Sequence, residues 1–206
     1  KKAPNWVLFL YLSIMVLKIK CGWCKGDTLY EKYHDSEWGV PLFDEQQLFE
    51  FLTLETFQAG LSWITVLRKR EEFRKAFDQF DYHKIATYSH TKEKELLNNS
   101  GIIRNRLKIS ATINNAKAFI NIQKLHGSFS DYIWRFVAGK PITNSHKSSN
   151  EIPSTTPLAE TISKNLKQNG FKFIGPTVIY AYMQATGMVN DHLIDCFRYK
   201  EVGLKR

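Results

Sequence analysis

The chain has 206 residues, of which 43% are hydrophobic, 14% aromatic and 24% charged. This composition is too apolar and too aromatic for a disordered protein, and the chain lacks the repeat of a fibrous one. Its length fits one large domain, or two lobes around a shared cleft. The net charge of +9 favours polyanionic partners such as nucleic acids.

The charge is unevenly distributed along the chain. Residues 21–60 hold two basic and eight acidic residues, whereas residues 61–126 hold thirteen basic and six acidic ones. An acidic segment beside a basic one predicts a pocket for a cationic group next to a surface for phosphates. The alternative is an uneven distribution over solvated faces that has no function.

An apolar run of twelve residues, 6–17, follows two lysines near the N-terminus. The run is too short to span a bilayer, and no small-residue cleavage site follows it, so we expect no membrane association. A cleaved signal peptide is the alternative. We interpret residues 1–14 as an extension outside the fold and residues 15–206 as one domain of two helical lobes.

Beyond residue 20 the apolar residues recur mostly at helical spacing, which predicts an all-α fold without strong strands. Asp44 is expected to cap a helix over residues 45–59, which Gly60 ends. Ser62 is expected to cap the next helix, over residues 63–77. Further helices are expected over residues 91–99, 104–125 and 129–137, followed by a loop over residues 139–156.

Two helices separated by a glycine-bounded turn are predicted in the last third of the chain. Thr156 should cap the first, over residues 157–169, and Pro176 should open the second. Free backbone N–H groups at the start of the second helix suit a phosphate, with Lys172 and Gly175 as the expected contacts. An ordinary helical hairpin without a ligand is the alternative.

Three cysteines are too few for a disulfide scaffold and indicate a reducing compartment or a metal site. The segment 191–196 is predicted to be helical, which would place His192 and Cys196 on one face as a shared metal requires. Cys21 and His34 could complete a zinc site of two Cys and two His, and a site that contains Cys24 is the main alternative. Four protein ligands would leave no water position, so the zinc would be structural.

Aromatic residues and carboxylates are concentrated between residues 23 and 63. Aromatic faces stack on a flipped base and favour a cationic one, although core packing is the alternative for each ring. Glu55 is harder to explain as a core residue, because it lies in the apolar stretch 51–57, where an unpaired charge is costly. The candidate base-binding residues are Trp23, Tyr30, Tyr33, Trp38, Glu55 and Trp63.

Seven specific sequence blocks occur in order between residues 21 and 196: Cys21-Gly-Trp23, Tyr33-His-Asp-Ser-Glu-Trp-Gly-Val40, Gln58-Ala-Gly-Leu-Ser-Trp-Ile-Thr-Val-Leu67, Gly101-Ile-Ile-Arg104, Glu151-Ile-Pro153, Gly170-Phe-Lys-Phe-Ile-Gly175 and Val189-Asn-Asp-His192. Together these blocks resemble the 3-methyladenine DNA glycosylase I family. Cys24 departs from the residue expected after Cys-Gly-Trp, and the residues before 15 match nothing in the pattern.

The resemblance implies a helix-hairpin-helix glycosylase fold with a zinc site. It implies that zinc is held by Cys21, His34, His192 and Cys196. It further implies that the methylated adenine is enclosed by Glu55, Tyr33 and Trp63, with Tyr30, Trp23 and Trp38 nearby. By the same resemblance, the tip that enters the duplex is formed by Gly60 and Leu61.

The activity implied by the resemblance is hydrolysis of the N-glycosidic bond of 3-methyladenine in alkylated double-stranded DNA, which releases the free base and leaves an abasic site. Asn190 stands where related glycosylases carry a catalytic Asp, but a cationic base leaves readily enough for a site without it. We expect Glu55 to carry the catalytic role in a cytoplasmic, bacterial-type monomer. A zinc-dependent DNA-binding module without activity and a metallohydrolase are the alternatives.

Overall fold

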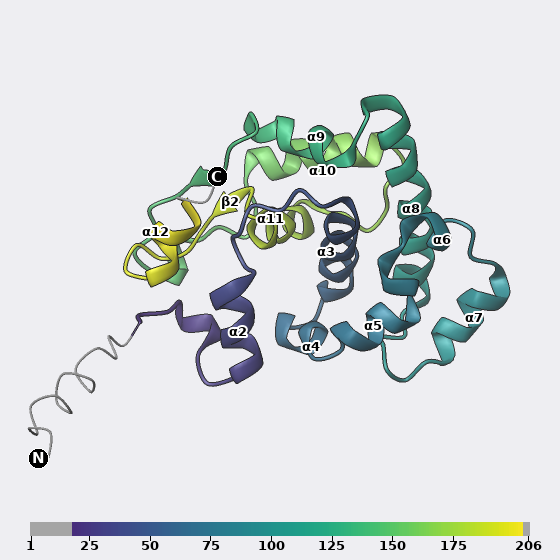
Figure 1. Cartoon of the computed structure of the whole chain (residues 1–206), viewed down its shortest axis with the longest axis horizontal. Helices are drawn as coiled ribbons and strands as arrows, with labels where there is room; N and C mark the ends of the chain where they lie inside the picture. The colour runs from purple at the N-terminus through teal and green to yellow at the C-terminus, as the bar shows by residue number, and fades with distance from the viewer. Residues whose placement is uncertain (1–17, 204–206) are drawn as a thin grey trace, which may run out of the picture.

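The computed structural model describes residues 18–203, which are mostly helical (Figure 1). The extension expected at residues 1–14 lies outside the described residues. Within residues 18–203, no helix is long and apolar enough to cross a membrane. The all-α prediction is therefore confirmed for the described part of the chain, apart from one small pair of strands.

The two ends of the described chain meet in space. A short 3-10 turn, η1 (Gly22–Cys24), leads into α2 (Thr28–Ser36), and the last helix is α12 (Phe197–Gly203). The backbone N–H of Phe197 donates a hydrogen bond to the carbonyl of Ile19 at 2.9 Å. Figure 1 shows the purple N-terminal segment beside the yellow C-terminal one. This meeting brings together cysteines and histidines that are about 170 positions apart.

Helix α3 (Glu45–Gln58) forms the centre of the core. Asp44 caps it as predicted, by accepting a hydrogen bond from the N–H of Gln47 at 2.9 Å, and Gly60 follows its end with a left-handed φ of 83°. Residues 48–57 are all buried, because α3 packs against α4, α8, α9 and α11. Any polar side chain in this stretch therefore needs a partner or a ligand.

The single helix expected over residues 63–77 is wrong, because the chain forms α4 (Trp63–Leu67) and then α5 (Arg70–Ala76). The break turns Arg70 inward, where its guanidinium pairs with the carboxylates of Glu50 and Glu37. Ser62 occupies the expected N-cap position. Its hydroxyl is hydrogen-bonded to the Thr65 hydroxyl and caps no backbone N–H of α4.

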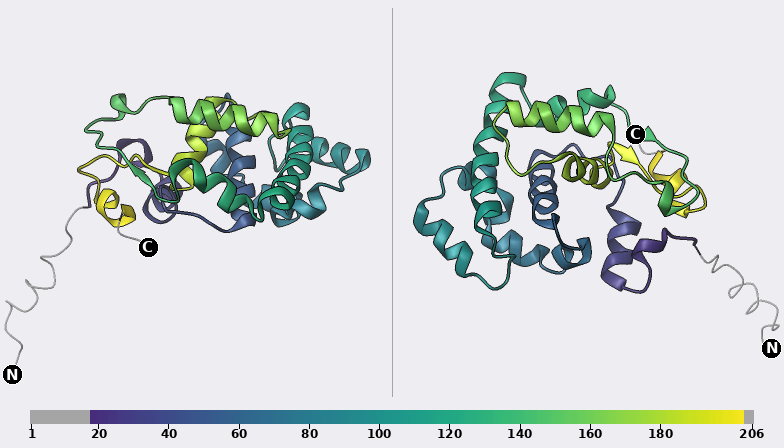
Figure 2. Two further views of the ribbon diagram at one scale, coloured as in Figure 1. Left: turned by 90° about the horizontal axis from the view of Figure 1, so that it is seen from above. Right: turned by 180° about the vertical axis from the view of Figure 1, so that it is seen from behind.

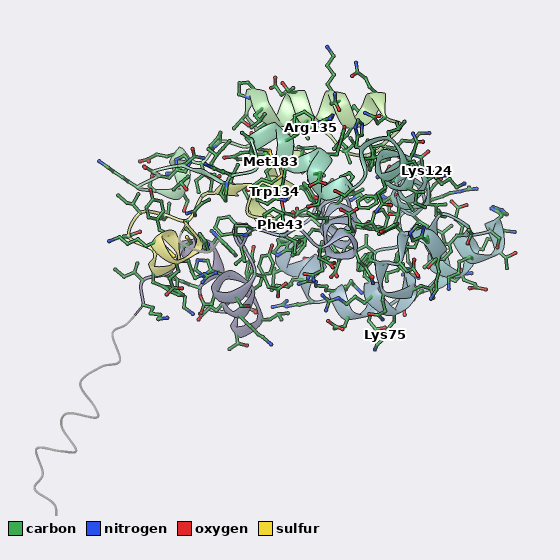
Figure 3. All side chains as sticks on the ribbon, turned by 45° about the horizontal axis from the view of Figure 1, so that its top comes forward. Phe43, Lys75, Lys124, Trp134, Arg135 and Met183 are labelled. Carbon is green, nitrogen blue, oxygen red and sulfur yellow. The ribbon has the colours of Figure 1, made fainter. Side chains whose placement is uncertain are left out.

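The helices expected in the middle of the chain are confirmed, with boundaries shifted by one or two residues. The expected helix over residues 129–137 ends as a 3-10 turn. The confirmed elements are α7 (His90–Asn98), α8 (Arg106–His126), α9 (Phe129–Trp134) and η3 (Arg135–Val137). They are preceded by two short elements that were not predicted, η2 (Asp78–Phe80) and α6 (Tyr82–Ile85). Trp134 stacks on Phe43 with ring centroids 4.5 Å apart (Figure 3) and so fixes α9 to the segment before α3.

The expected loop over residues 139–156 contains a strand, β1 (Ile142–Thr143), and a 3-10 turn, η4 (Ser149–Glu151). Strand β1 pairs in parallel with β2 (Val189–Asn190), Ile142 opposite Val189. Two residues per strand are too few for an alternating pattern, which explains why the sequence did not predict them. The pairing ties the loop to the segment that follows α11.

The predicted pair of helices in the last third is confirmed as α10 (Pro157–Gln168) and α11 (Pro176–Ala185). The hydroxyl of Thr156 caps α10 by accepting a hydrogen bond from the N–H of Ala159 at 3.2 Å. Helix α11 begins at Pro176 as expected. Figure 2 shows α10 on the outside of the molecule and α11 beneath it, against α3.

Candidate functional site

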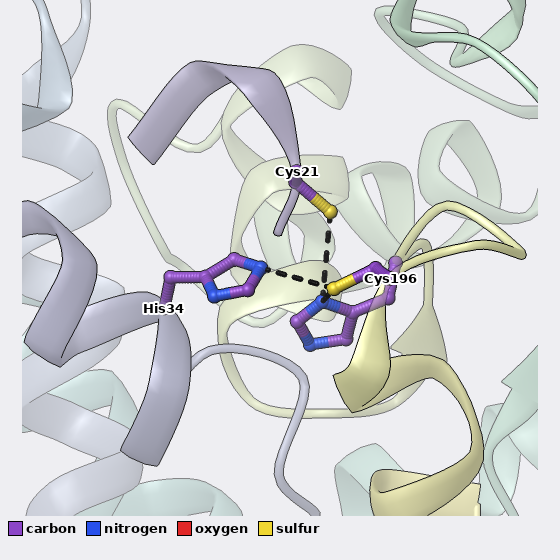
Figure 4. Close-up of side chains that lie close together, drawn as sticks. Cys21, His34 and Cys196 are labelled. Atoms are coloured by element: carbon purple, nitrogen blue, oxygen red, sulfur yellow. Dashed lines mark hydrogen bonds between the residues drawn. The ribbon is translucent and has the colours of Figure 1, made fainter. Parts of the chain in front are cut away.

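A buried cluster of two thiols and two imidazoles joins the ends of the chain (Figure 4). The potential ligand atoms of Cys21, His34, His192 and Cys196 all lie within 4.8 Å of one another. The Cys196 Sγ lies 3.4 Å from Nε2 of His34 and 3.6 Å from Nδ1 of His192, and the Cys21 Sγ lies 3.7 Å from that same Nδ1. This donor set matches the sulfur and nitrogen ligands of a closed tetrahedral zinc site.

The surroundings of the cluster orient both imidazole rings. Nδ1 of His34 contacts the Asp35 carboxylate at 2.8 Å, and Nε2 of His192 contacts the Trp38 carbonyl at 3.1 Å. The other nitrogen of each ring therefore faces the sulfurs, as in metal sites whose ligands are held by outer hydrogen bonds. A hydrogen bond from the Cys21 thiol lowers the pKa of Cys196, which favours a thiolate in the cluster.

The helix expected over residues 191–196 is wrong, because this segment forms turns between β2 and α12. The side chain of Asn190 accepts a hydrogen bond from the N–H of His192 at 3.2 Å, and the N–H of Cys196 donates to Leu193. His192 and Cys196 meet all the same, since the turn reverses the chain between them. Cys24 lies outside the cluster, with its thiol donating to the Cys21 carbonyl, so the geometry disfavours the alternative ligand set.

A cavity of about 290 Å³ lies next to this cluster. All six base-binding residues expected from the sequence line it, from η1, α2, α3, α4 and the turn after α2. Its complete lining is Trp23, Tyr30, Tyr33, Trp38, Glu55, Gln58, Trp63, Ser149, Ile152, Ala181 and Gln184. The structure thus brings together residues that the sequence had shown only as a concentration of aromatics and acids.

The aromatic walls connect the cavity to the cluster of Cys and His side chains. The rings of Tyr33 and Trp63 have centroids 5.3 Å apart, and those of Trp23 and Trp38 are 5.0 Å apart. Trp38 also packs edge-on against His192, with centroids 4.6 Å apart. Because Trp38 contacts both sites, displacement of the cluster would displace one wall of the cavity.

Glu55 is a buried acid in the wall of this cavity. The residue is 3% exposed, and its Oε2 has no hydrogen-bond partner among residues 18–203. Burial raises the pKa of this carboxyl to about 8. The pKa of Tyr33 also lies well above its usual value, mainly because the hydroxyl is buried and secondly because of the charge of Glu55. The indole N–H of Trp63 is likewise buried without a partner, so the cavity presents an acceptor and a donor to a ligand.

A second cavity of about 310 Å³ opens beside the first and shares Glu55, Gln58 and Ala181 with it. Gly60 and Leu61, the expected tip residues, line this second cavity, and Leu61 is 43% exposed. The start of α11 forms the other side. Lys172 and Gly175 line neither cavity but lie in the turn that leads into α11, with Gly175 at its N-cap.

Comparison with known proteins identifies the family. The sequence profile of methyladenine glycosylases matches residues 23–199. A DNA-3-methyladenine glycosylase from Haemophilus influenzae is 49% identical over 177 residues, which cover 86% of this chain and 96% of the relative. DNA-3-methyladenine glycosylase 1 of Escherichia coli is 47% identical over 180 residues, which cover 87% and 96%. The chain belongs to the methyladenine glycosylase family.

Solved structures of methyladenine glycosylases have the same fold. A crystal structure of 3-methyladenine DNA glycosylase I superposes with a TM-score of 0.85 at 49% identity, covering 87% of this chain and 98% of that one. A structure described as the basis of 3-methyladenine recognition by the Staphylococcus aureus enzyme gives a TM-score of 0.85 at 35% identity, covering 91% and 97%.

Sequence reasoning missed five residues that line the pocket of this methyladenine glycosylase. Gln58 could have been found, because it lies three positions after Glu55 and hence on the same face of α3. Ser149 and Ile152 come from the long loop, where the block Glu151-Ile-Pro153 was the only signal. Ala181 and Gln184 carry no chemistry that marks them in the sequence.

Proposed function

We propose that this chain is a monomeric bacterial DNA glycosylase that excises 3-methyladenine from alkylated duplex DNA, releasing the free base and leaving an abasic site. The observation that carries the proposal is the buried carboxyl of Glu55, whose Oε2 has no hydrogen-bond partner in the described part of the chain, in a cavity walled by aromatic rings. The names of the relatives from H. influenzae and E. coli support the same activity.

Recognition of the base follows from the charge of the lesion. Methylation at N3 makes adenine cationic, and a cation beside Glu55 would favour loss of the proton that burial keeps on this carboxyl. The resulting carboxylate would accept hydrogen bonds from the N–H groups of the base and balance its charge. The rings of Tyr33 and Trp63 would add a cation–π attraction that neutral adenine lacks. Trp23, Tyr30 and Trp38 would complete the walls of the cavity. An undamaged base is neutral and would gain no such attraction, so it would bind weakly.

The same charge makes the chemical step easier. The bond between C1′ and the base breaks, its electron pair leaves with the cationic base, and a water oxygen bonds to C1′ and loses a proton to solvent. Asn190, at the usual place of a catalytic Asp, does not assist, because its Nδ2 donates to the Tyr199 carbonyl and its Oδ1 accepts from His192. Glu55 would act as the catalytic residue by holding the cationic base in position while its positive charge passes to the sugar, so that the base leaves as neutral 3-methyladenine.

Contact with DNA would involve the two exposed turns beside the cavities. Leu61, next to Gly60, would fill the gap left in the duplex by the flipped nucleotide. In a helix-hairpin-helix arrangement, the side chain of Lys172 and the backbone N–H groups around Gly175 would hold a phosphate without reading sequence.

Zinc would be held by Cys21, His34, His192 and Cys196, two thiolates and two imidazoles that fit its tetrahedral preference. Four protein ligands leave no position for a reacting water, so the ion would act only as a structural link. It would fasten the N-terminal segment, and through Trp38 the wall of the base pocket, to the C-terminal turn.

The test is chromatographic identification of the base released when the protein is incubated with methylated duplex DNA. We expect free 3-methyladenine and an abasic strand that is not cleaved by the protein itself. A DNA-binding module would bind the duplex and release nothing. A metallohydrolase would stop at once on addition of chelator while its fold stayed intact.

A further inference from the structure

The two turns assigned to DNA contact are both held by buried side chains of helix α8. The first is the tip loop, residues 59–61, and the second is the hairpin, residues 170–175. The Lys108 ammonium donates to the carbonyls of Phe57 and Ala59, at 2.9 and 2.6 Å. Lys108 is only 6% exposed, so this lysine is buried against the end of α3 and not offered to solvent or phosphate.

Asn115 holds the hairpin in the same way. Its Nδ2 donates to the carbonyl of Lys172 at 3.0 Å, and its Oδ1 accepts from the N–H of Lys172 at 2.8 Å. Asn115 is 3% exposed, and both ends of its amide bond to the backbone of Lys172. The next residue, Phe173, has a left-handed φ of 58°, which is unfavourable for a side chain with a Cβ and requires support from its surroundings.

Lys108 and Asn115 are seven positions apart, which is close to two helical turns, so both project from one side of α8. A buried ammonium is costly, and burial lowers the pKa of Lys108. An apolar side chain would fill the same space at lower cost. A lysine is favoured here only because its ammonium lies at the C-terminal end of α3, where unpaired carbonyls and the helix dipole attract a cation.

We propose that Lys108 and Asn115 are positioning residues that fix the tip loop and the hairpin at the separation at which one DNA duplex meets both. The proposal rests on the proposed function. Insertion of Leu61 and the grip on a phosphate must occur on the same duplex, and an error of about 1 Å in such an arrangement can cost about 100-fold in rate. A single helix that binds both loops would prevent this error.

The experiment compares Lys108→Met and Asn115→Leu with the control Thr112→Val. Thr112 lies between the two positions, is 1% exposed, and donates its hydroxyl only to the Lys108 carbonyl of its own helix. Three quantities are measured: the single-turnover rate of excision from duplex, the affinity for a duplex with an abasic site, and the affinity for free 3-methyladenine.

We expect Lys108→Met to slow excision about tenfold or more, because the wedge is misplaced, and to leave the affinity for the free base unchanged. Asn115→Leu should weaken duplex affinity about tenfold and keep the rate at saturating protein. Thr112→Val should match the parent in all three measurements. This division between rate and affinity is not expected of side chains that merely stabilise the core.

The proposal is overturned if Lys108→Met and Asn115→Leu behave like Thr112→Val, or if each lowers free-base affinity by the same factor as excision. Should either variant not fold, Lys108→Gln replaces Lys108→Met and Asn114→Ala replaces Asn115→Leu. Both are judged in the same way, since the half-buried Asn114 donates to the Gly170 carbonyl of the hairpin at 2.6 Å. If the parent releases no base, the proposed function fails, and weaker duplex binding by Asn115→Leu but not Thr112→Val still decides the positioning role.

Discussion

The Cys–His cluster and the cavity that contains Glu55 are adjacent buried polar sites that differ in whether their polar atoms have partners. In the cluster, the outer nitrogen of each imidazole is hydrogen-bonded, that of His34 to Asp35 and that of His192 to the Trp38 carbonyl. The inner nitrogens and the two sulfurs face one another. In the pocket, Glu55 and Trp63 each leave a buried polar atom without a partner among the described residues. We therefore expect the first arrangement to serve stability, as a closed metal site would, and the second to receive a ligand.

Loss of the metal ligands should have the largest effect, because structural zinc contributes about 10 kcal/mol or more to the folding of small sites. We expect Cys196→Ala to lower the metal content and the melting temperature together, and base binding with them. Cys24→Ala is the matched control, a buried thiol outside the cluster that should keep the metal. Full zinc content and stability in Cys196→Ala would remove Cys196 from the ligand set.

Glu55→Gln should change the base affinity of the pocket and leave the cluster unaffected. The substitution removes the charge and keeps the size, so we expect 3-methyladenine to bind about 10–100-fold more weakly, as for a lost charge-assisted hydrogen bond. Excision should fall, and zinc content should not change. Titration of the free base into each protein measures the effect.

Glu50→Gln is the control, and we expect it to change stability and not base affinity. Glu50 is a buried carboxylate on the same helix, but it is paired with Arg70 and Arg74. We therefore expect it to lower the free energy of unfolding and to leave base affinity intact. Equal binding by Glu55→Gln and the parent would contradict the recognition mechanism.

The raised pKa of Glu55 predicts a dependence of stability on pH. Between about pH 4.5 and 8 the folded protein holds a proton on Glu55 that the unfolded chain has lost. The free energy of unfolding should therefore fall as the pH rises through this window, by roughly 1–4 kcal/mol. Denaturant titrations of the parent and Glu55→Gln at pH 5 and 8 measure it. An equal change in the free energy of unfolding between pH 5 and 8 in both proteins would show that Glu55 is not the group responsible.

The smallest effect is expected at the mouth of the pocket. Leu61→Ala should reduce excision from duplex about tenfold and leave binding of free 3-methyladenine unchanged, because the side chain acts on the DNA and not on the base. Leu125→Ala is the control, an exposed leucine at the far end of α8. Equal loss in both assays would mean that Leu61 supports the pocket wall instead.

Local sequence signals determined most of the helices and the identity of the key side chains. Asp44 and Thr156 marked two helix starts correctly, since a cap depends on neighbouring backbone N–H groups. Glu55 was conspicuous because a charge in an apolar stretch needs a reason. The specific blocks indicated the family before any geometry was known, and four of the aromatic residues they contain, Trp23, Tyr33, Trp38 and Trp63, do line the cavity.

Tertiary structure decided whatever depends on contacts between distant segments. The break between α4 and α5 accompanies the pairing of Arg70 with Glu50 and Glu37, the short strands form only against each other, and residues 191–196 turn where a local pattern indicated a helix. Choosing His34 over Cys24 as a neighbour of Cys196 likewise required the fold. Helical periodicity reports which face of a segment is buried, but it carries no information about the partner on the other side, and partners define both sites here.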